Sequence, residues 1–303
     1  MSRPLAVLLL VICTMLWGFA FVAQKGAMAH MGPLTFSAVR YIMGTVLVAP
    51  LAIAEYRRER RNGLVVSRHQ WIGIAVLSLF FFLGVWLQQA ALITASVTNG
   101  GFITSLYVIF TPVVGFLTLR TRPHPIVYLG IPLALIGIYL LTGADFGRIA
   151  IGDGLLLGCA ICWGVQVALL GQLVKETRLP VAISTLNFLA TGLLALVFAP
   201  LLEQPNLAGI ANGWIEILYA GILSTAVAFT LQAVGQQYVP PANAAIILSA
   251  ESLFAALGGA IILGERLPPL GYFGAAMIFG TIVLVELVPV LAARRVSPSP
   301  GSA

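Results

Sequence analysis

The stretch HQWIGIAVLSLFFFLGVWLQQAALITASVTNGGFITSLYVIFTPVVGFLTL, residues 69–119, contains no Asp, Glu, Lys or Arg. A helix rises about 1.5 Å per residue, so it needs about 20 apolar residues to cross the hydrocarbon core of a bilayer. These 51 residues are long enough for two passes. They are also too long and too continuously apolar for barrel strands, which have about 9–11 residues of alternating polarity. The stretch therefore predicts two membrane-spanning helices.

The rest of the chain has a similar composition. Of its 303 residues, 60% are hydrophobic and 9% are charged, and the mean hydropathy is +1.02. Soluble domains carry about 25% charged residues, so a water-facing fold is excluded, as are a disordered chain and a disulfide scaffold. The three cysteines lie within apolar stretches, and the net charge of +6 comes mainly from short loops. We therefore expect neither a redox or metal centre nor nucleic-acid binding.

Breaks in the apolar pattern predict an all-α polytopic membrane protein with ten transmembrane helices. Charged loops mark most breaks, and the uncharged segments TASVTNGG (94–101) and QQYVPPAN (236–243) mark two more. The expected spans are Leu5–Gln24, Leu34–Ala54, Trp71–Ile93, Ser96–Leu119, Pro125–Gly143, Gly154–Leu173, Leu179–Leu202, Gly213–Gly235, Pro241–Gly264 and Pro268–Ala293.

The basic residues predict the orientation of these spans. With a cytoplasmic N-terminus, Lys25, Arg148 and Arg266 are the three loop residues on the far side. Cytoplasmic loops carry an excess of Lys and Arg, so both termini are expected in the cytoplasm of an inner (plasma) membrane protein. Twelve basic loop residues then lie on the cytoplasmic side: Arg3, Arg57, Arg58, Arg60, Arg61, Arg68, Arg120, Arg122, Lys175, Arg178, Arg294 and Arg295.

The two halves of the chain repeat one another. A shift of 146 aligns Leu9–Gly18 with Leu155–Gly164, both of which read L-L-x-x-C-x-x-x-W-G, and a shift of 144 aligns residues 85–142 with 229–286 at fourteen identical positions. Each repeat holds five spans, so the two copies are expected in opposite orientations. Inverted repeats place a substrate site near the midplane and permit alternating access. The expected units are residues 1–147, residues 148–293 and a flexible cytoplasmic tail, 294–303.

A further set of motifs comprises Trp17-Gly18, Trp163-Gly164, Lys25, Arg40-Tyr41 and SAESLFAALGGAIILGER at Ser249–Arg266. With these motifs the chain resembles the EamA-type members of the drug/metabolite transporter superfamily over nearly its whole length. Two differences are Ser252, where the family usually has proline, and Leu119–Arg122, where the first half lacks the Gly-Glu ending. The resemblance implies ten helices in two inverted five-helix repeats and export or uptake of small metabolites, without choosing among amino acids, sugars and drugs.

Ionisable groups inside a span cost about 2.5–3.5 kcal/mol to insert, so each is a candidate site residue. Glu251 lies near the midplane of the predicted ninth helix, where it could carry a proton, pair with a substrate ammonium or form a structural hydrogen bond. Arg40 could bind a substrate carboxylate, form a fixed ion pair, possibly with Glu251, or help set topology. Lys25 is expected to snorkel to the interface. Interface anchors are expected at Glu216, Glu265, Arg266 and Glu286.

Uncharged polar and aromatic residues form a second candidate set. Gln88 and Gln232 are equivalent in the repeats, as are Asn99 and Asn243. These amides could line a polar pathway or tie helices together. Aromatic rings and amides share one face of the first helix and one face of the sixth. Such a face could bind an amphiphilic or aromatic solute, or it could be part of the packed core. The further candidates are Trp17, Phe21, Gln24, Tyr107, Trp163 and Gln166.

The sequence therefore predicts a secondary transporter for a small organic metabolite. The favoured substrate is an amino acid or a related amphiphile, and the resemblance implies export. The alternatives are a proton-independent facilitator or exchanger for another metabolite or drug, and a non-transporting membrane scaffold or sensor. The chain lacks HExxH, G-x-S-x-G and Walker motifs, so we expect no enzyme, no catalytic residue and no cofactor. The expected partners are a small-molecule substrate and the lipid bilayer, and a monomer or homodimer remains open.

Overall fold

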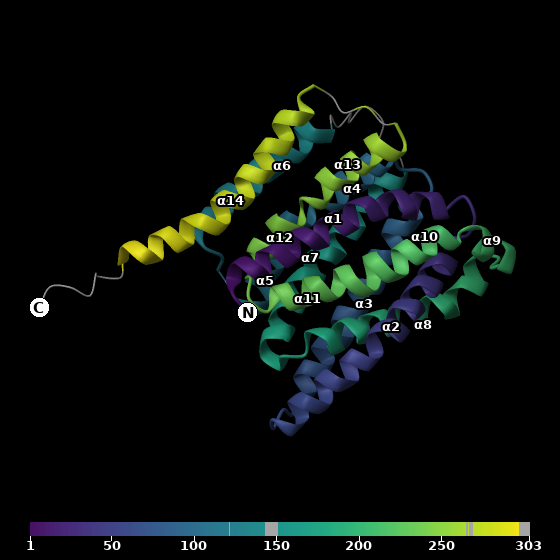
Figure 1. Cartoon of the computed structure of the whole chain (residues 1–303), viewed down its shortest axis with the longest axis horizontal. Helices are drawn as coiled ribbons and strands as arrows, with labels where there is room; N and C mark the ends of the chain where they lie inside the picture. The colour runs from purple at the N-terminus through teal and green to yellow at the C-terminus, as the bar shows by residue number, and fades with distance from the viewer. Residues whose placement is uncertain (121, 143–150, 265, 267–268, 297–303) are drawn as a thin grey trace, which may run out of the picture.

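The computed structural model describes residues 1–120, 122–142, 151–264, 266 and 269–296 (Figure 1). Throughout this part of the chain the regular structure is helical. The elements are α1 (Arg3–Ala27), α2 (Pro33–Arg61), α3 (Arg68–Ala91), α4 (Val97–Thr104), α5 (Tyr107–Leu119), α6 (Pro125–Thr142), α7 (Ile151–Thr177), α8 (Pro180–Leu202), α9 (Leu207–Asn212), α10 (Trp214–Leu218), the π-helix η1 (Tyr219–Phe229), α11 (Thr230–Gln236), α12 (Pro241–Leu248), α13 (Glu251–Ile262) and α14 (Gly271–Val296).

Eight helical stretches in the described residues are long and apolar enough to cross a membrane. They are α1, α2, α3, α4 with α5, α7, α8, α10 through α11, and α12 with α13. The predicted fifth and tenth spans correspond to α6 and α14, whose apolar parts within the described residues are Pro125–Leu140 and Gly271–Val285. The structure therefore supports eight of the ten predicted spans by length and composition.

Several predictions fall on residues outside the described ranges or on side chains that are not described. These are the boundary between the units at 147–148, Arg148, Glu265, the start of the tenth span at Pro268, the side chain of Glu286 and most of the tail. The tail was expected to begin at residue 294, but α14 continues through Val296. Helix α2 likewise extends past the predicted end at Ala54 to Arg61, because the charged segment that follows is rich in the helix formers Arg and Glu.

The predicted fourth and ninth spans are each broken near the middle. The first break separates α4 from α5 at Ser105–Leu106, and the second separates α12 from α13 at Ser249–Ala250. Ser105 and Ser249 are aligned by the 144-residue shift, and the Ser105 hydroxyl lies 3.3 Å from the Ser249 carbonyl oxygen, to which it donates. The two breaks therefore meet at equivalent positions of the two halves.

Helices from the two halves pack against one another. Helix α2 lies along α8, α3 along α7, α1 against α13, and α5 against α7, while α6 and α14 lie side by side at one edge (Figure 1). Gly18 of α1 packs against Phe254, and Gly164 of α7 packs against Phe110. A Cβ at either glycine would overlap the phenylalanine, so the W-G motifs allow equivalent close approaches in both halves.

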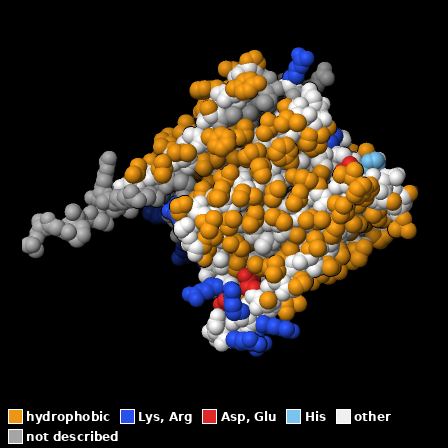
Figure 2. Space-filling model, viewed as in Figure 1, with side chains coloured by type: hydrophobic (Ala, Val, Ile, Leu, Met, Phe, Trp, Pro, Cys, Tyr) orange, Lys and Arg blue, Asp and Glu red, His pale blue; other side chains and the backbone are white. Residues whose placement is uncertain are grey.

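The outer surface is apolar. Figure 2 shows hydrophobic side chains over most of one face, with Lys and Arg gathered beside the C-terminal end of α2. Large hydrophobic side chains are exposed on most of the long helices, Leu51, Leu117 and Leu201 among them. An apolar surface with charges at its edge is expected of a protein surrounded by lipid.

Candidate functional site

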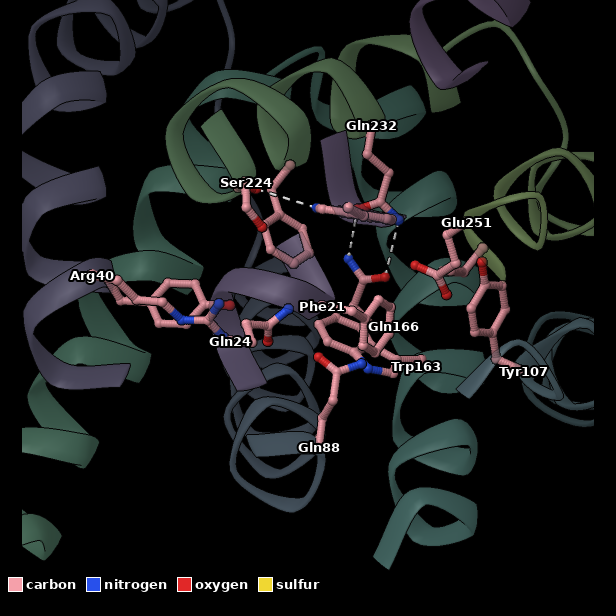
Figure 3. Close-up of a pocket in the computed structure, with 14 residues that line it drawn as sticks. Phe21, Gln24, Arg40, Gln88, Tyr107, Trp163, Gln166, Ser224, Gln232 and Glu251 are labelled. Atoms are coloured by element: carbon pink, nitrogen blue, oxygen red, sulfur yellow. Dashed lines mark hydrogen bonds between the residues drawn. The ribbon is translucent and has the colours of Figure 1, made fainter. Parts of the chain in front are cut away.

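A cavity lies among the long helices near the two helix breaks (Figure 3). The cavity is narrow in this conformation: about 30 Å³ of it is open to the centre of a water molecule, which is room for a few waters. Its side chains come from α1, α2, α3, α5, α7, η1, α11 and α13. The lining residues are Trp17, Phe21, Gln24, Arg40, Tyr41, Gln88, Tyr107, Trp163, Gln166, Val167, Ser224, Phe229, Gln232 and Glu251.

Ten of the twelve candidate site residues from the sequence line this cavity; Asn99 and Asn243 do not. Asn99 lies in the first turn of α4, where its backbone N–H donates to Ser96 Oγ. The Asn243 amide lies 3.4 Å from the Val285 carbonyl oxygen and ties α12 to α14. Both asparagines lie in the first turn of their helices, well before the breaks and away from the cavity.

Lys25 makes a specific contact at the end of α3. Its ammonium donates to the carbonyl oxygens of Leu92 at 2.8 Å and Ile93 at 3.1 Å. Carbonyls at the end of a helix have no partner within the helix, and a cation there is stabilising. Lys25 therefore caps the C-terminus of α3.

A pair of amides crosses the cavity. Gln166 of α7 and Gln232 of α11 donate to each other, with Nε2–Oε1 distances of 3.2 and 3.1 Å (Figure 3). Gln88 instead donates to Thr104 Oγ1 at 3.3 Å. These amides therefore line the cavity and also join helices.

Several buried polar atoms around the cavity make no hydrogen bond within the described structure. They are Gln24 Oε1, Arg40 Nε, Tyr41 Oη, Tyr107 Oη, Trp163 Nε1 and Glu251 Oε1. A buried polar group without a partner costs about 1–3 kcal/mol. Because six such atoms surround one cavity, the cavity is suited to water or a ligand that can form hydrogen bonds with them.

The two charged residues of the cavity lie on opposite sides of it. Figure 3 shows Arg40 on one side and Glu251 on the other, with Tyr107 facing the glutamate. Glu251 is 4% exposed and Arg40 2% exposed, and across the described residues neither takes part in an ion pair. The Arg40–Glu251 ion pair considered from the sequence is therefore not formed. The guanidinium carbon lies 4.6 Å from the Tyr41 ring centroid, a cation–π contact.

Aromatic rings form a wall between the charges. The ring centroid of Phe229 lies 4.5 Å from that of Trp17, 4.8 Å from that of Phe81 and 5.7 Å from that of Trp163. The indole N–H of Trp17 donates to the Ser224 carbonyl at 3.2 Å. This wall and the amides together make an amphiphilic lining.

Sequence reasoning missed four lining residues as site candidates: Tyr41, Val167, Ser224 and Phe229. Two of them left a signal, because Tyr41 adjoins Arg40 and Val167 is the 146-residue counterpart of Phe21. Ser224 and Phe229 are five residues apart, which on an α-helix separates them by about 140°. The i→i+5 bonding of the π-helix η1 brings them onto one side, and no periodicity in the sequence indicates that.

An all-helical membrane protein with a polar cavity beside two broken helices has the build of a membrane transporter. The comparison of sequences agrees: the chain belongs to the EamA-like transporter family, whose model matches residues 4–143 and 150–287. This family lies within the drug/metabolite transporter superfamily.

Individual relatives extend over most of the chain. An uncharacterized transporter of Archaeoglobus fulgidus is 31% identical over 94% of this chain and 87% of its own length. The uncharacterized transporter YwfM of Bacillus subtilis is 28% identical over 93% and 94%. The threonine/homoserine exporter RhtA of Escherichia coli is 24% identical over 96% and 92%. A solved crystal structure with 19% identity has the same fold, with a TM-score of 0.76 over 98% of this chain and 100% of that one.

Proposed function

We propose that this transporter moves an amino acid or a related amphiphile by alternating access between two inverted five-helix repeats. The repeats are residues 1–147 and 148–293, with ten membrane-spanning helices, a cytoplasmic tail at 294–303 and both termini in the cytoplasm. The sequence repeat and the meeting of the two helix breaks support this architecture. The excess of basic loop residues on one side supports the orientation.

The observation that carries the substrate proposal is the separation across one cavity of two buried ionisable side chains that form no ion pair with each other. Arg40 offers a planar guanidinium that suits a carboxylate, and Glu251 offers a partner for an ammonium. A zwitterionic amino acid has both groups, and the Trp17–Phe229–Trp163 wall suits its apolar part. The similarity to RhtA, a threonine/homoserine exporter, supports the same substrate class and the export direction.

Glu251 is also the proposed coupling residue. A carboxyl that alternates between a proton and a substrate ammonium links proton movement to amino-acid movement, because both cannot occupy it together. Tyr107 faces this carboxyl and can donate to its charged form. Export would then proceed in exchange for protons.

The test is uptake of labelled amino acids, threonine and homoserine first, into proteoliposomes with and without an imposed pH gradient. We expect uptake that rises with the gradient in the wild type and is lost in Glu251→Gln. Glu216→Gln is the matched control, since Glu216 does not line the cavity, and it should keep the wild-type rate. Gradient-independent uptake would make the protein a facilitator and remove the coupling proposal. Absence of amino-acid uptake would overturn the substrate proposal, and sugars, nucleosides and drugs would be tested next.

A further inference from the structure

Two glutamates join α2 to α8 in the same way at opposite ends of this helix pair. Glu203, just after α8, accepts hydrogen bonds from the backbone N–H groups of Leu34 at 2.6 Å and Thr35 at 2.9 Å. Glu55, near the end of α2, accepts a hydrogen bond from the backbone N–H of Ala182 at 2.8 Å. Each carboxylate therefore caps the first turn of the other helix, which α2 and α8 can do reciprocally because they run antiparallel.

The local sequence leaves both helix starts in need of such a cap. Each begins with proline, Pro33 or Pro180, and neither N-cap residue makes a side-chain hydrogen bond. The first N–H groups of a helix have no partner within it, and its N-terminus favours negative charge. At the α2 end a Cβ on Gly32 would overlap the Glu203 carboxylate, so glycine there admits the cap.

Each cap borders a surface cleft. One cleft is lined by Glu55, Asn62 and Tyr238, and the other by His30, Thr35 and Gln204, next to Glu203. Both glutamates are half-buried. A carboxylate that releases its partner helix can therefore reach water at once, which keeps its charge solvated. Such a contact is suited to breaking and re-forming.

The caps also hold helices from different halves. Within the described part of the chain, the hydrogen bonds that join α2 to α8 all end on these two carboxylates. Alternating access requires that contacts between the halves break at one face while those at the other face persist. Arg40, on the cavity, lies only five residues after Thr35 on the same helix, so a movement of this end of α2 away from α8 would also move Arg40.

We infer that Glu203 and Glu55 are reciprocal gating residues, each of which holds one face of the transporter closed. This inference rests on the proposed alternating access but not on the identity of the substrate. Neutralising one glutamate then favours opening at its own face and leaves the other face closed.

The experiment measures the opening of each face without substrate. Spin labels on cysteines at His30 and Gln204 report one cleft, and labels at Asn62 and Tyr238 report the other, in the full chain in lipid nanodiscs. The parent protein, whose three cysteines are buried, gives the background labelling. Pulsed electron paramagnetic resonance then gives the populations of short and long distances for each pair.

Glu203→Gln should raise the ratio of long to short distances for the 30/204 pair roughly 2- to 30-fold, the range expected for loss of a helix cap, without raising that of the 62/238 pair. Glu55→Gln should do the reverse. Gly32→Ala should act like Glu203→Gln, because it displaces the same carboxylate while keeping it charged. The matched controls are Glu216→Gln and Glu59→Gln, which should change neither pair; Glu59 pairs with Arg58.

Equal changes at both faces, or unchanged distances with only a lower melting temperature, would overturn the inference and make the glutamates a fixed brace. These outcomes do not depend on uptake, so a failed substrate assay and a failed gating role remain distinguishable.

Discussion

The third helix of the first half and its counterpart in the second differ at the cavity. Helix α3 is a regular α-helix, whereas the 144-residue shift places it on a stretch that contains the π-helix η1. Both stretches bring a glutamine to the cavity, Gln88 or Gln232, but η1 adds Ser224 and Phe229. The halves share a scaffold, and the second half departs from it where the cavity is lined.

The charged residues of the cavity also differ between the two halves. Glu251 is the 144-residue counterpart of Tyr107, and Arg40 is the 147-residue counterpart of Asn187. Asn187 is buried outside the cavity and accepts a hydrogen bond from Ser78 Oγ at 2.7 Å. Asn187 thus packs outside the cavity and Tyr107 lines it as a neutral phenol, so in each pair only one copy presents an ionisable carboxyl or guanidinium group to the cavity. The repeat supplies the architecture, and the differences between its copies supply the candidate chemistry.

The largest expected effect comes from the Tyr107–Glu251 pair. Glu251→Gln should lower the initial rate of amino-acid uptake about 10- to 150-fold, because hydrogen bonds to a charged group contribute about 1.5–3 kcal/mol. Tyr107→Phe should lower it about 10-fold at most, since only a neutral donor is lost. Initial rates in proteoliposomes measure both. An equal fall in uptake rate in both variants would mean that Tyr107 and Glu251 contribute alike, and that the difference between these equivalent positions does not matter for transport.

Next in size is the replacement of Arg40 by its counterpart, Arg40→Asn. The KM for a zwitterionic amino acid should rise about tenfold, because the substrate carboxylate loses a charged partner. Uptake of the corresponding methyl ester, which lacks the carboxylate, should change little. Competition between the acid and the ester in the same vesicles measures the ratio. An ester affected as strongly as the acid would show that Arg40 acts on structure and not on the carboxylate.

The sequence predicts the spans well and the site in part. Membrane insertion depends on local hydrophobicity, so eight spans are recovered. The cost of burying ionisable groups points to Arg40 and Glu251, and the repeat and the shared helix faces point to the other eight predicted residues that line the cavity. What it cannot predict arises from tertiary geometry. The π-helix that turns Ser224 and Phe229 inward, and the α3 carbonyls that Lys25 caps, depend on how helices meet. The same holds for the contact of Asn243 with α14.

Enlarging the glycine of each W-G motif tests whether the two halves depend equally on close helix packing at this position. Gly18→Val and Gly164→Val should each destabilise the fold by about 1–3 kcal/mol, because the added atoms overlap Phe254 or Phe110. The control is Gly154→Ala, where nothing lies within 4 Å of the added Cβ. Thermal unfolding in detergent measures all three. A large effect in one half alone would show that the close packing at these motifs is not shared.

The smallest expected effect on stability comes from comparing a charged with a neutral hydrogen-bond donor between helices. Lys25 joins α1 to the end of α3, and Gln237 donates to the Val174 carbonyl of α7 at 3.2 Å. Lys25 is partly exposed and solvent screens its charge, so Lys25→Met should destabilise the fold by about 0.3–1 kcal/mol, and Gln237→Met should cost about 0.5–1.5 kcal/mol. Hydrogen exchange of the last turn of α3 should rise in Lys25→Met alone, because those carbonyls lose their cap. Unchanged exchange there would mean that water replaces the ammonium without loss, and that the two ties are equivalent despite the difference in charge.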